Sequence, residues 1–230
     1  RRARQSRLSG RETQDTSVSM TPRYETPRVR LYEGSADDVL ATLMTEKIGV
    51  VLTDPPYWHW AHICDVGERE HLDLRKETLW MGDILMMTLA WLPMIRALRP
   101  GVTWLFADPH YIAIYIRVAR YLKWPMVGWW SALNGDHSEY LIAFSDTEPH
   151  RDWSAIVRDI LRDVNTYGQA KSAAMLRRIL TLSPDGMVLD PFCGSGTTLV
   201  AALHDGRDAI GIEMDAVIAA KAEALLRTVA

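Results

Sequence analysis

An α/β fold, in which helices cover both faces of a mostly parallel β-sheet, is predicted by three features of this sequence. From residue 29 onward, short apolar segments of strand length alternate with segments of helical periodicity. Two of the apolar segments run into turns rich in proline or glycine, at Asp54 and at Gly194. Two late apolar segments stand close together, which indicates an antiparallel hairpin at one edge of the sheet.

The elements follow in order from this alternation. Strands are predicted at residues 49–53, 102–107, 126–132, 139–144, 187–189 and 209–212. Helices are predicted at residues 36–45, 83–98, 111–122, 153–163, 172–182, 197–204 and 216–228. Asp83 is the predicted N-cap of the second helix, and Asp108 that of the third. Residues 58–79 show no sustained period and are predicted to form a mobile connection.

Length and composition indicate one folded domain. The chain has 230 residues, of which 48% are hydrophobic, which suits a single well-buried domain over residues 29–230. Residues 1–28 are rich in arginine and are predicted to be a disordered basic tail, with a nucleic-acid-binding arm as the alternative. The net charge of −3 does not indicate a polyanion-binding protein.

Cysteine usage and hydropathy indicate a cytoplasmic protein without a membrane span. Cys64 and Cys193 stand far apart, in no disulfide or metal-binding pattern. No apolar run reaches the roughly 18 residues that a membrane-spanning helix needs.

The turn over residues 190–197 has the features of a nucleotide-binding turn. Gly194 and Gly196 permit positive φ and a close backbone approach, and the helix that starts at Thr197 offers free N–H groups. Glu213 follows Gly194 by about 20 residues, the spacing of an acid that accepts ribose hydroxyls. The turn lacks a phosphate-binding lysine, so a nucleoside-type cofactor is favoured over ATP. A strand-to-helix turn without a ligand is the alternative.

A second constellation follows the strand at residues 49–53. Asp54, Pro55, Pro56 and Tyr57 stand at its carboxyl end, where open α/β sheets bind ligands. The Asp54 carboxylate and the Pro55 carbonyl can accept both protons of an amino group, which returns the nitrogen lone pair for attack on an electrophilic methyl group. Tyr57 can stack on a base extruded from a duplex, and Trp58 can help to line the pocket that receives it. Core packing is favoured for Trp129 and Trp130, with the lining of that pocket as the alternative.

Together these motifs resemble the DNA amino-methyltransferases that act on cytosine N4 and adenine N6, in the permuted order with the target motif first. The resemblance implies a Rossmann-like sheet of seven strands and S-adenosylmethionine as cofactor. It implies direct in-line methyl transfer to the exocyclic amino nitrogen of a flipped-out base in DNA. The residues implied to bind the cofactor are Asp190, Pro191, Phe192, Gly194, Ser195, Gly196, Thr197 and Glu213.

The sequence departs from the family in two places. A family segment before the cofactor helix is matched only by residues 167–172, from which Gln169 and Lys171 are assigned to the methionine end of the cofactor. Only residues 145–165 remain for target recognition, too few for a full recognition domain. The chain is therefore expected to read a short or loose sequence, to rely on a homodimer or a specificity partner, or to use residues 58–79.

Adenine N6 is favoured as target because family members that act on cytosine more often have serine in place of Asp54. Cytosine N4, an RNA amino-methyltransferase and a non-catalytic partner subunit remain as alternatives, as does a role in restriction-modification. His59, His62 and His71 share one loop, but methyl transfer needs no metal and none is predicted.

Overall fold

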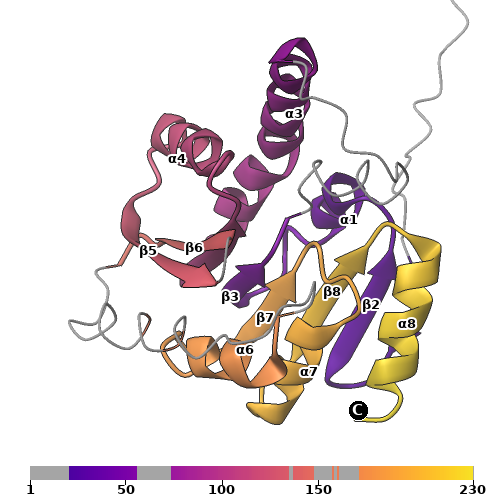
Figure 1. The fold of residues 1–230 in the computed structure, drawn as a ribbon. Helices are drawn as coiled ribbons and strands as arrows, with labels where there is room; N and C mark the ends of the chain where they lie inside the picture. The colour runs from indigo at the N-terminus through magenta and orange to yellow at the C-terminus, as the bar shows by residue number, and fades with distance from the viewer. Residues whose placement is uncertain are drawn as a thin grey trace, which may run out of the picture.

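The computed structural model describes residues 21–55, 74–134, 137–147, 157, 160 and 171–229, without the side chains of residues 74–84, 132–134 and 137–139. Its centre is a mixed sheet of eight strands (Figure 1). In spatial order the strands are β1 (Tyr24–Glu25), β2 (Val29–Glu33), β8 (Ala209–Glu213), β7 (Met187–Asp190), β3 (Ile48–Thr53), β4 (Val102–Ala107), β6 (His137–Phe144) and β5 (Met126–Asn134).

The middle of the sheet is parallel and both edges are antiparallel. The strands β2, β8, β7, β3 and β4 run parallel to one another. At the edges, β1 is antiparallel to β2, and β6 is antiparallel to both β4 and β5. The predicted edge hairpin is therefore confirmed, with Asn134 opposite His137. The prediction of seven strands is wrong by one, because β1 pairs with β2 at the other edge. A two-residue strand is too short to show a period in the sequence.

Residues 21–28, which the composition assigned to the basic tail, contribute this edge strand. The amide of Arg23 donates to the carbonyl of Leu31 at 2.7 Å. The Arg23 side chain forms ion pairs with Glu33 and with Glu223, the latter at 2.9 Å. Arginines in this stretch therefore belong to ion pairs of the folded domain. Residues 1–20 lie outside the described residues.

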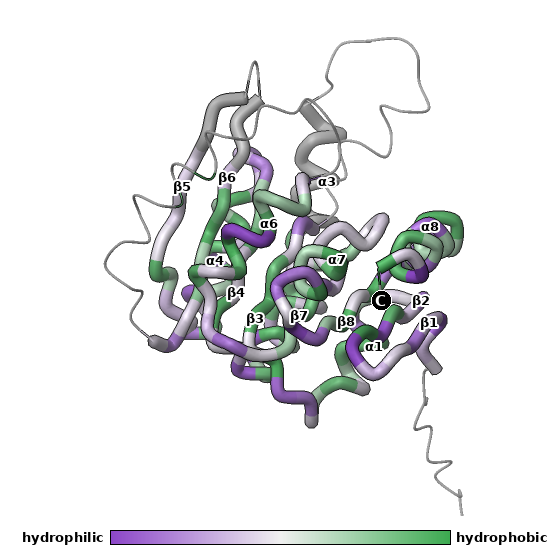
Figure 2. Tube along the Cα trace, turned by 90° about the horizontal axis from the view of Figure 1, so that it is seen from below, coloured by the Kyte–Doolittle hydropathy of each residue, from purple (hydrophilic) through white to green (hydrophobic). Residues whose placement is uncertain are grey.

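Helices cover both faces of the sheet (Figure 1). They are α1 (Ala36–Thr42), α3 (Leu74–Leu98), α4 (Ile112–Tyr121), α6 (Ala173–Leu180), α7 (Thr197–His204) and α8 (Ala216–Leu226). One core cluster joins α6, α7 and α8 to one face, and a second joins α1, α3 and α4 to the other. Val50 and Leu52 belong to the first cluster and Val51 to the second, so β3 is buried on both sides. Hydrophobic residues gather along inner strands such as β4 and β6, and also on the helix α8 (Figure 2).

The helix α3 begins earlier than predicted. It starts at Leu74, so Asp83 is inside the helix and does not cap it, and residues 74–79 of the predicted connection are helical. Residues 74–81 are mostly leucine, lysine, arginine, glutamate and methionine, which have high intrinsic helix propensity but no regular apolar stripe. The apolar period alone therefore placed the start too late. Pro93 also lies within α3.

Several predicted segments lie wholly or partly outside the described residues. These are residues 58–73 of the predicted connection and most of the helix at 153–163, of which positions 157 and 160 are helical and buried. Within the described part of the chain, no helix is long and apolar enough to cross a membrane.

Candidate functional site

The candidate site lies where the strand order of the sheet reverses. From the central pair, the chain continues from β3 to β4 on one side and from β7 to β8 on the other. These four strands are parallel, so their carboxyl ends meet at one edge of the sheet. Asp54 follows β3, residues 191–196 follow β7, and Glu213 ends β8. Ligands of open α/β sheets bind at such a reversal.

The glycine turn after β7 adopts the left-handed backbone that the sequence predicted. Gly194 has φ +53° and Gly196 has φ +87°. A Cβ added at Gly196 would stand 3.2 Å from the Cβ of Ala222, whereas one added at Gly194 would meet no heavy atom of the described residues within 4 Å. Gly196 is thus required by the packing of α7 against α8, while Gly194 borders open space above the turn.

Glu213 and the glycine turn lie together in the structure. One oxygen of its carboxylate, Oε2, accepts a hydrogen bond from the amide of Gly194 at 3.0 Å. The other, Oε1, accepts from the amide of Asp215 at 2.8 Å. Each carboxylate oxygen can accept more than one hydrogen bond, so both retain capacity for a ligand hydroxyl.

Asp190 lies beneath the turn. Its side chain is 2% exposed. The carboxylate accepts hydrogen bonds from the hydroxyl of Thr53 at 2.7 Å and from the amide of Phe192 at 3.1 Å. Burial raises the pKa of Asp190 to about 6, although the hydrogen bonds from Thr53, Thr198 and Phe192 oppose this shift. Sequence reasoning missed Thr53, and the one available signal was a polar residue that ends an apolar strand.

Asp54 and Lys171 form an ion pair across the site. Lys171 Nζ is 3.1 Å from Asp54 Oδ2, and it also lies 4.9 Å from the centroid of the Phe106 ring. Their side chains are 16% exposed for Lys171 and 29% for Asp54. The sequence assigned Lys171 to the cofactor side, whereas the structure pairs it with the carboxylate of the target motif.

The remaining predicted site residues divide into exposed and buried positions. Ser195 is exposed, Thr197 is half-buried at the first position of α7, and Pro191 is buried. Phe192 is half-buried and meets Trp91 edge to face, with ring centroids 5.2 Å apart. Pro56, Tyr57, Trp58 and Gln169 lie outside the described residues, as do His59, His62 and His71.

Two further sequence interpretations need correction. Core packing holds for Trp130, which is 5% exposed, but Trp129 is 54% exposed and stacks on Tyr140 with ring centroids 6.1 Å apart. Asp108 does not cap α4, because the N-cap is Tyr111. The Asp108 carboxylate instead accepts the His110 amide at 2.8 Å, and it lies 2.7 Å from that residue's ring Nδ1.

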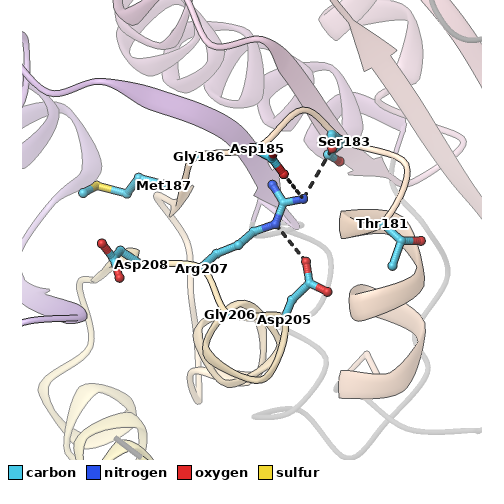
Figure 3. A pocket seen from close by; sticks show the side chains of 9 residues that line it. All are labelled: Thr181, Ser183, Asp185, Gly186, Met187, Asp205, Gly206, Arg207 and Asp208. Carbon is cyan, nitrogen blue, oxygen red and sulfur yellow. Dashed lines mark hydrogen bonds and ion pairs between the residues drawn. The ribbon is translucent and has the colours of Figure 1, made fainter.

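A polar hollow of about 600 Å³ lies at the opposite edge of the sheet, beside the amino ends of β7 and β8 (Figure 3). Arg207 reaches across it. Its guanidinium donates to the carbonyls of Leu180 at 3.0 Å, of Ser183 at 3.3 Å and of Pro184, and its Nε pairs with Asp205 at 2.8 Å. Because the guanidinium is already engaged, the hollow is a structural junction, and the described motif residues lie at the other edge of the sheet.

The chain is similar in sequence to known DNA methylases. Residues 119–224 match the N6/N4 methyltransferase family model, described as DNA methylase. Over 61 residues, 26% of the chain, the sequence is 41% identical to the DNA adenine methyltransferase YhdJ of Escherichia coli K12. The matched segment spans 21% of the length of that enzyme.

Solved structures share the fold over nearly the whole chain. TTHA0409 of Thermus thermophilus, a putative DNA modification methylase complexed with S-adenosyl-L-methionine, has a TM-score of 0.61 and 22% identity over 88% of this chain and 96% of that one. The PvuII DNA methyltransferase, which is cytosine-N4-specific, has a TM-score of 0.67 and 16% identity over 89% of this chain and 88% of that one. The predicted Rossmann-like α/β fold is confirmed.

Proposed function

From the match of residues 119–224 to the N6/N4 DNA methylase family, we propose that this chain transfers a methyl group from S-adenosylmethionine to an exocyclic amino nitrogen of a base in DNA. The preferred target is adenine N6. The observation that carries the proposal is the position of the two motif turns on adjacent parallel strands, β3 and β7, at the reversal of strand order.

The residues around the glycine turn fit S-adenosylmethionine. Gly194 borders open space, and the Glu213 carboxylate stands on the turn with capacity to accept ribose hydroxyls. When bound, S-adenosylmethionine would supply an electrophilic methyl group.

On the substrate side, Asp54 binds the target amino group and accepts its proton. Its carboxylate and the Pro55 carbonyl accept the two protons of the target amino group, which localises the nitrogen lone pair. Asp54 Oδ then takes up the proton that the methylated nitrogen loses. Lys171, paired to Oδ2, orients this carboxylate. Tyr57 and Trp58 supply the stacking surface for the extruded base.

The identity of the base rests on Asp54. Its presence in place of serine supports adenine N6, as does the similarity to the adenine methyltransferase YhdJ. Cytosine N4 is the second candidate, because the cytosine-N4-specific PvuII enzyme shares this fold. Because residues 145–165 are few, we also propose that target recognition is short or is completed by a second copy or a specificity partner.

The first experiment identifies the product. The purified protein is incubated with tritiated S-adenosylmethionine and duplex DNA, single-stranded DNA or RNA, and the labelled nucleoside is then identified after digestion. N6-methyladenine from DNA is the expected result. N4-methylcytosine from DNA would mean that the target base is cytosine. Label confined to RNA, or no label with any substrate, would contradict the proposal.

A second experiment tests the role of Asp54. The variant Asp54→Asn is expected to lower kcat by about 10²–10⁴-fold, because the amide is a weaker proton acceptor, while cofactor binding persists. Lys171→Met is expected to lower kcat less. Asp108→Asn is the matched control, because Asp108 follows the neighbouring strand β4 and its carboxylate is engaged by His110. Equal losses in Asp54→Asn and Asp108→Asn would contradict the assignment.

A further inference from the structure

One buried hydrogen bond joins the target strand to the cofactor strand. Thr53, the last residue of β3, donates through its hydroxyl to Oδ1 of Asp190, the last residue of β7, at 2.7 Å. The two side chains are 1% and 2% exposed. Thr53 directly precedes Asp54, and Asp190 directly precedes the glycine turn. The bond therefore connects the starting points of both motif turns.

The bond lies beyond the end of the backbone pairing between these strands. The pairing of β3 with β7 begins with Ile48 opposite Met187 and ends with Val51 opposite Leu189. On the other side of β3 the pairing continues further, with Thr53 opposite Leu105 in β4. The backbone pairing of β3 and β7 thus ends before either strand does, and the bond between Thr53 and Asp190 joins the two strands beyond the last pair.

We propose that Thr53 is a positioning residue, whose hydrogen bond to Asp190 sets the distance between the methyl-acceptor turn and the cofactor turn. This inference rests on the proposed function. A displacement of about 1 Å between reacting groups is enough to cost on the order of 10²-fold in rate. The bond is suited to this role because it joins two residues that are 137 positions apart.

The same bond acts on the charge of Asp190. Hydrogen bonds from Thr53, Thr198 and the Phe192 amide hold its pKa down against burial and against the negative charge of Asp54. Loss of the Thr53 hydroxyl therefore raises the pKa of Asp190. A larger fraction of Asp190 is then protonated near neutral pH, and it holds the Phe192 amide less well.

The test compares Thr53→Val with Thr103→Val. Both replace a buried strand threonine by valine in the same sheet. Within the described residues, the Thr103 hydroxyl has no hydrogen-bond partner, so its loss leaves nothing unpaired. Thr53→Val is expected to lower kcat about 10- to 100-fold with a smaller change in the KM for DNA, and to shift the pH profile of S-adenosylmethionine binding toward higher pH. Thr53→Ser restores both, and Thr103→Val changes neither.

Three outcomes overturn the proposal. They are a wild-type kcat and pH profile in Thr53→Val, equal losses in Thr53→Val and Thr103→Val, and no restoration by Thr53→Ser. If the wild-type protein binds S-adenosylmethionine but methylates no nucleic acid, the proposed function fails. The pH profile of cofactor binding then still decides the role of Thr53. Absence of cofactor binding by the wild-type protein overturns both.

Discussion

Gly194 and Gly206 both adopt a left-handed backbone conformation, and they lie at opposite edges of the sheet. Their φ values are +53° and +81°, and a Cβ added at either would meet no heavy atom within 4 Å in the part of the chain that the structure describes. Alanine at each position therefore has the same local cost, about 1–2 kcal/mol for the left-handed conformation. Any difference in cofactor affinity between the two alanine variants therefore arises from a ligand that lies above the turn at Gly194.

We expect Gly194→Ala to weaken S-adenosylmethionine binding by about tenfold or more, because its methyl group projects into the open space above the cofactor turn. Gly206→Ala is expected to leave binding unchanged. Isothermal titration calorimetry measures the affinity, and thermal unfolding measures the shared loss of stability. Equal affinities in the two variants would place the cofactor away from this turn.

At the scale of elements, Arg207 joins the end of α6 to the connection between α7 and β8. Its guanidinium satisfies carbonyls at and beyond the C-terminus of α6, from Leu180 to Pro184, and its Nε holds Asp205. The side chain is 10% exposed, so water replaces these partners poorly if it is removed. Figure 3 shows it lying between the two segments.

Replacement of Arg207 by methionine is expected to lower the free energy of unfolding by at least about 2 kcal/mol, because hydrogen bonds with charged groups contribute about 1.5–3 kcal/mol each and several are lost together. The control is Arg227→Met, whose pair with Glu223 on α8 is 62% exposed on the arginine side. That change should cost far less, because solvent screens an exposed pair. Urea unfolding measures the loss of unfolding free energy in both variants. A similar loss in the two would mean that Arg207 does not stabilise the contact between α6 and the connection that precedes β8.

At the scale of the whole molecule, the buried carboxylate of Asp190 couples stability to pH. Its pKa is about 6 in the folded molecule, against an ordinary value of 3.8. The folded state therefore binds more protons between these values. The contribution to stability is fully present below about pH 3.8 and is lost as the pH rises through about 6, a change on the order of 3 kcal/mol.

Asp190→Asn removes this titration while keeping an acceptor oxygen for Thr53. Between about pH 4 and 7 the unfolding free energy of the variant is expected to fall less, or to rise more, than that of the wild-type protein, measured by urea unfolding at fixed pH values. Other ionisable groups are common to both proteins, so the difference between the two slopes isolates Asp190. Parallel slopes would contradict the raised pKa.

Sequence pattern by itself determined the features that depend on neighbouring residues. The apolar runs predicted the buried strands, and β4 was predicted with its observed bounds, Val102–Ala107. The glycine turn, the start of α7 at Thr197 and the spacing to Glu213 were also local features, because turn conformation and helix starts depend on residues a few positions apart. The start of α3 was missed because helix propensity, without an apolar stripe, decided it.

Only the tertiary structure decided which distant residues meet. The order of strands puts β3 beside β7, and from this follow the bond between Thr53 and Asp190 and the approach of Lys171 to Asp54. Periodicity records which face of an element is buried, but not which element covers it. Both of these pairs join residues that are far apart in the sequence, so their contacts depend on the folded sheet as a whole.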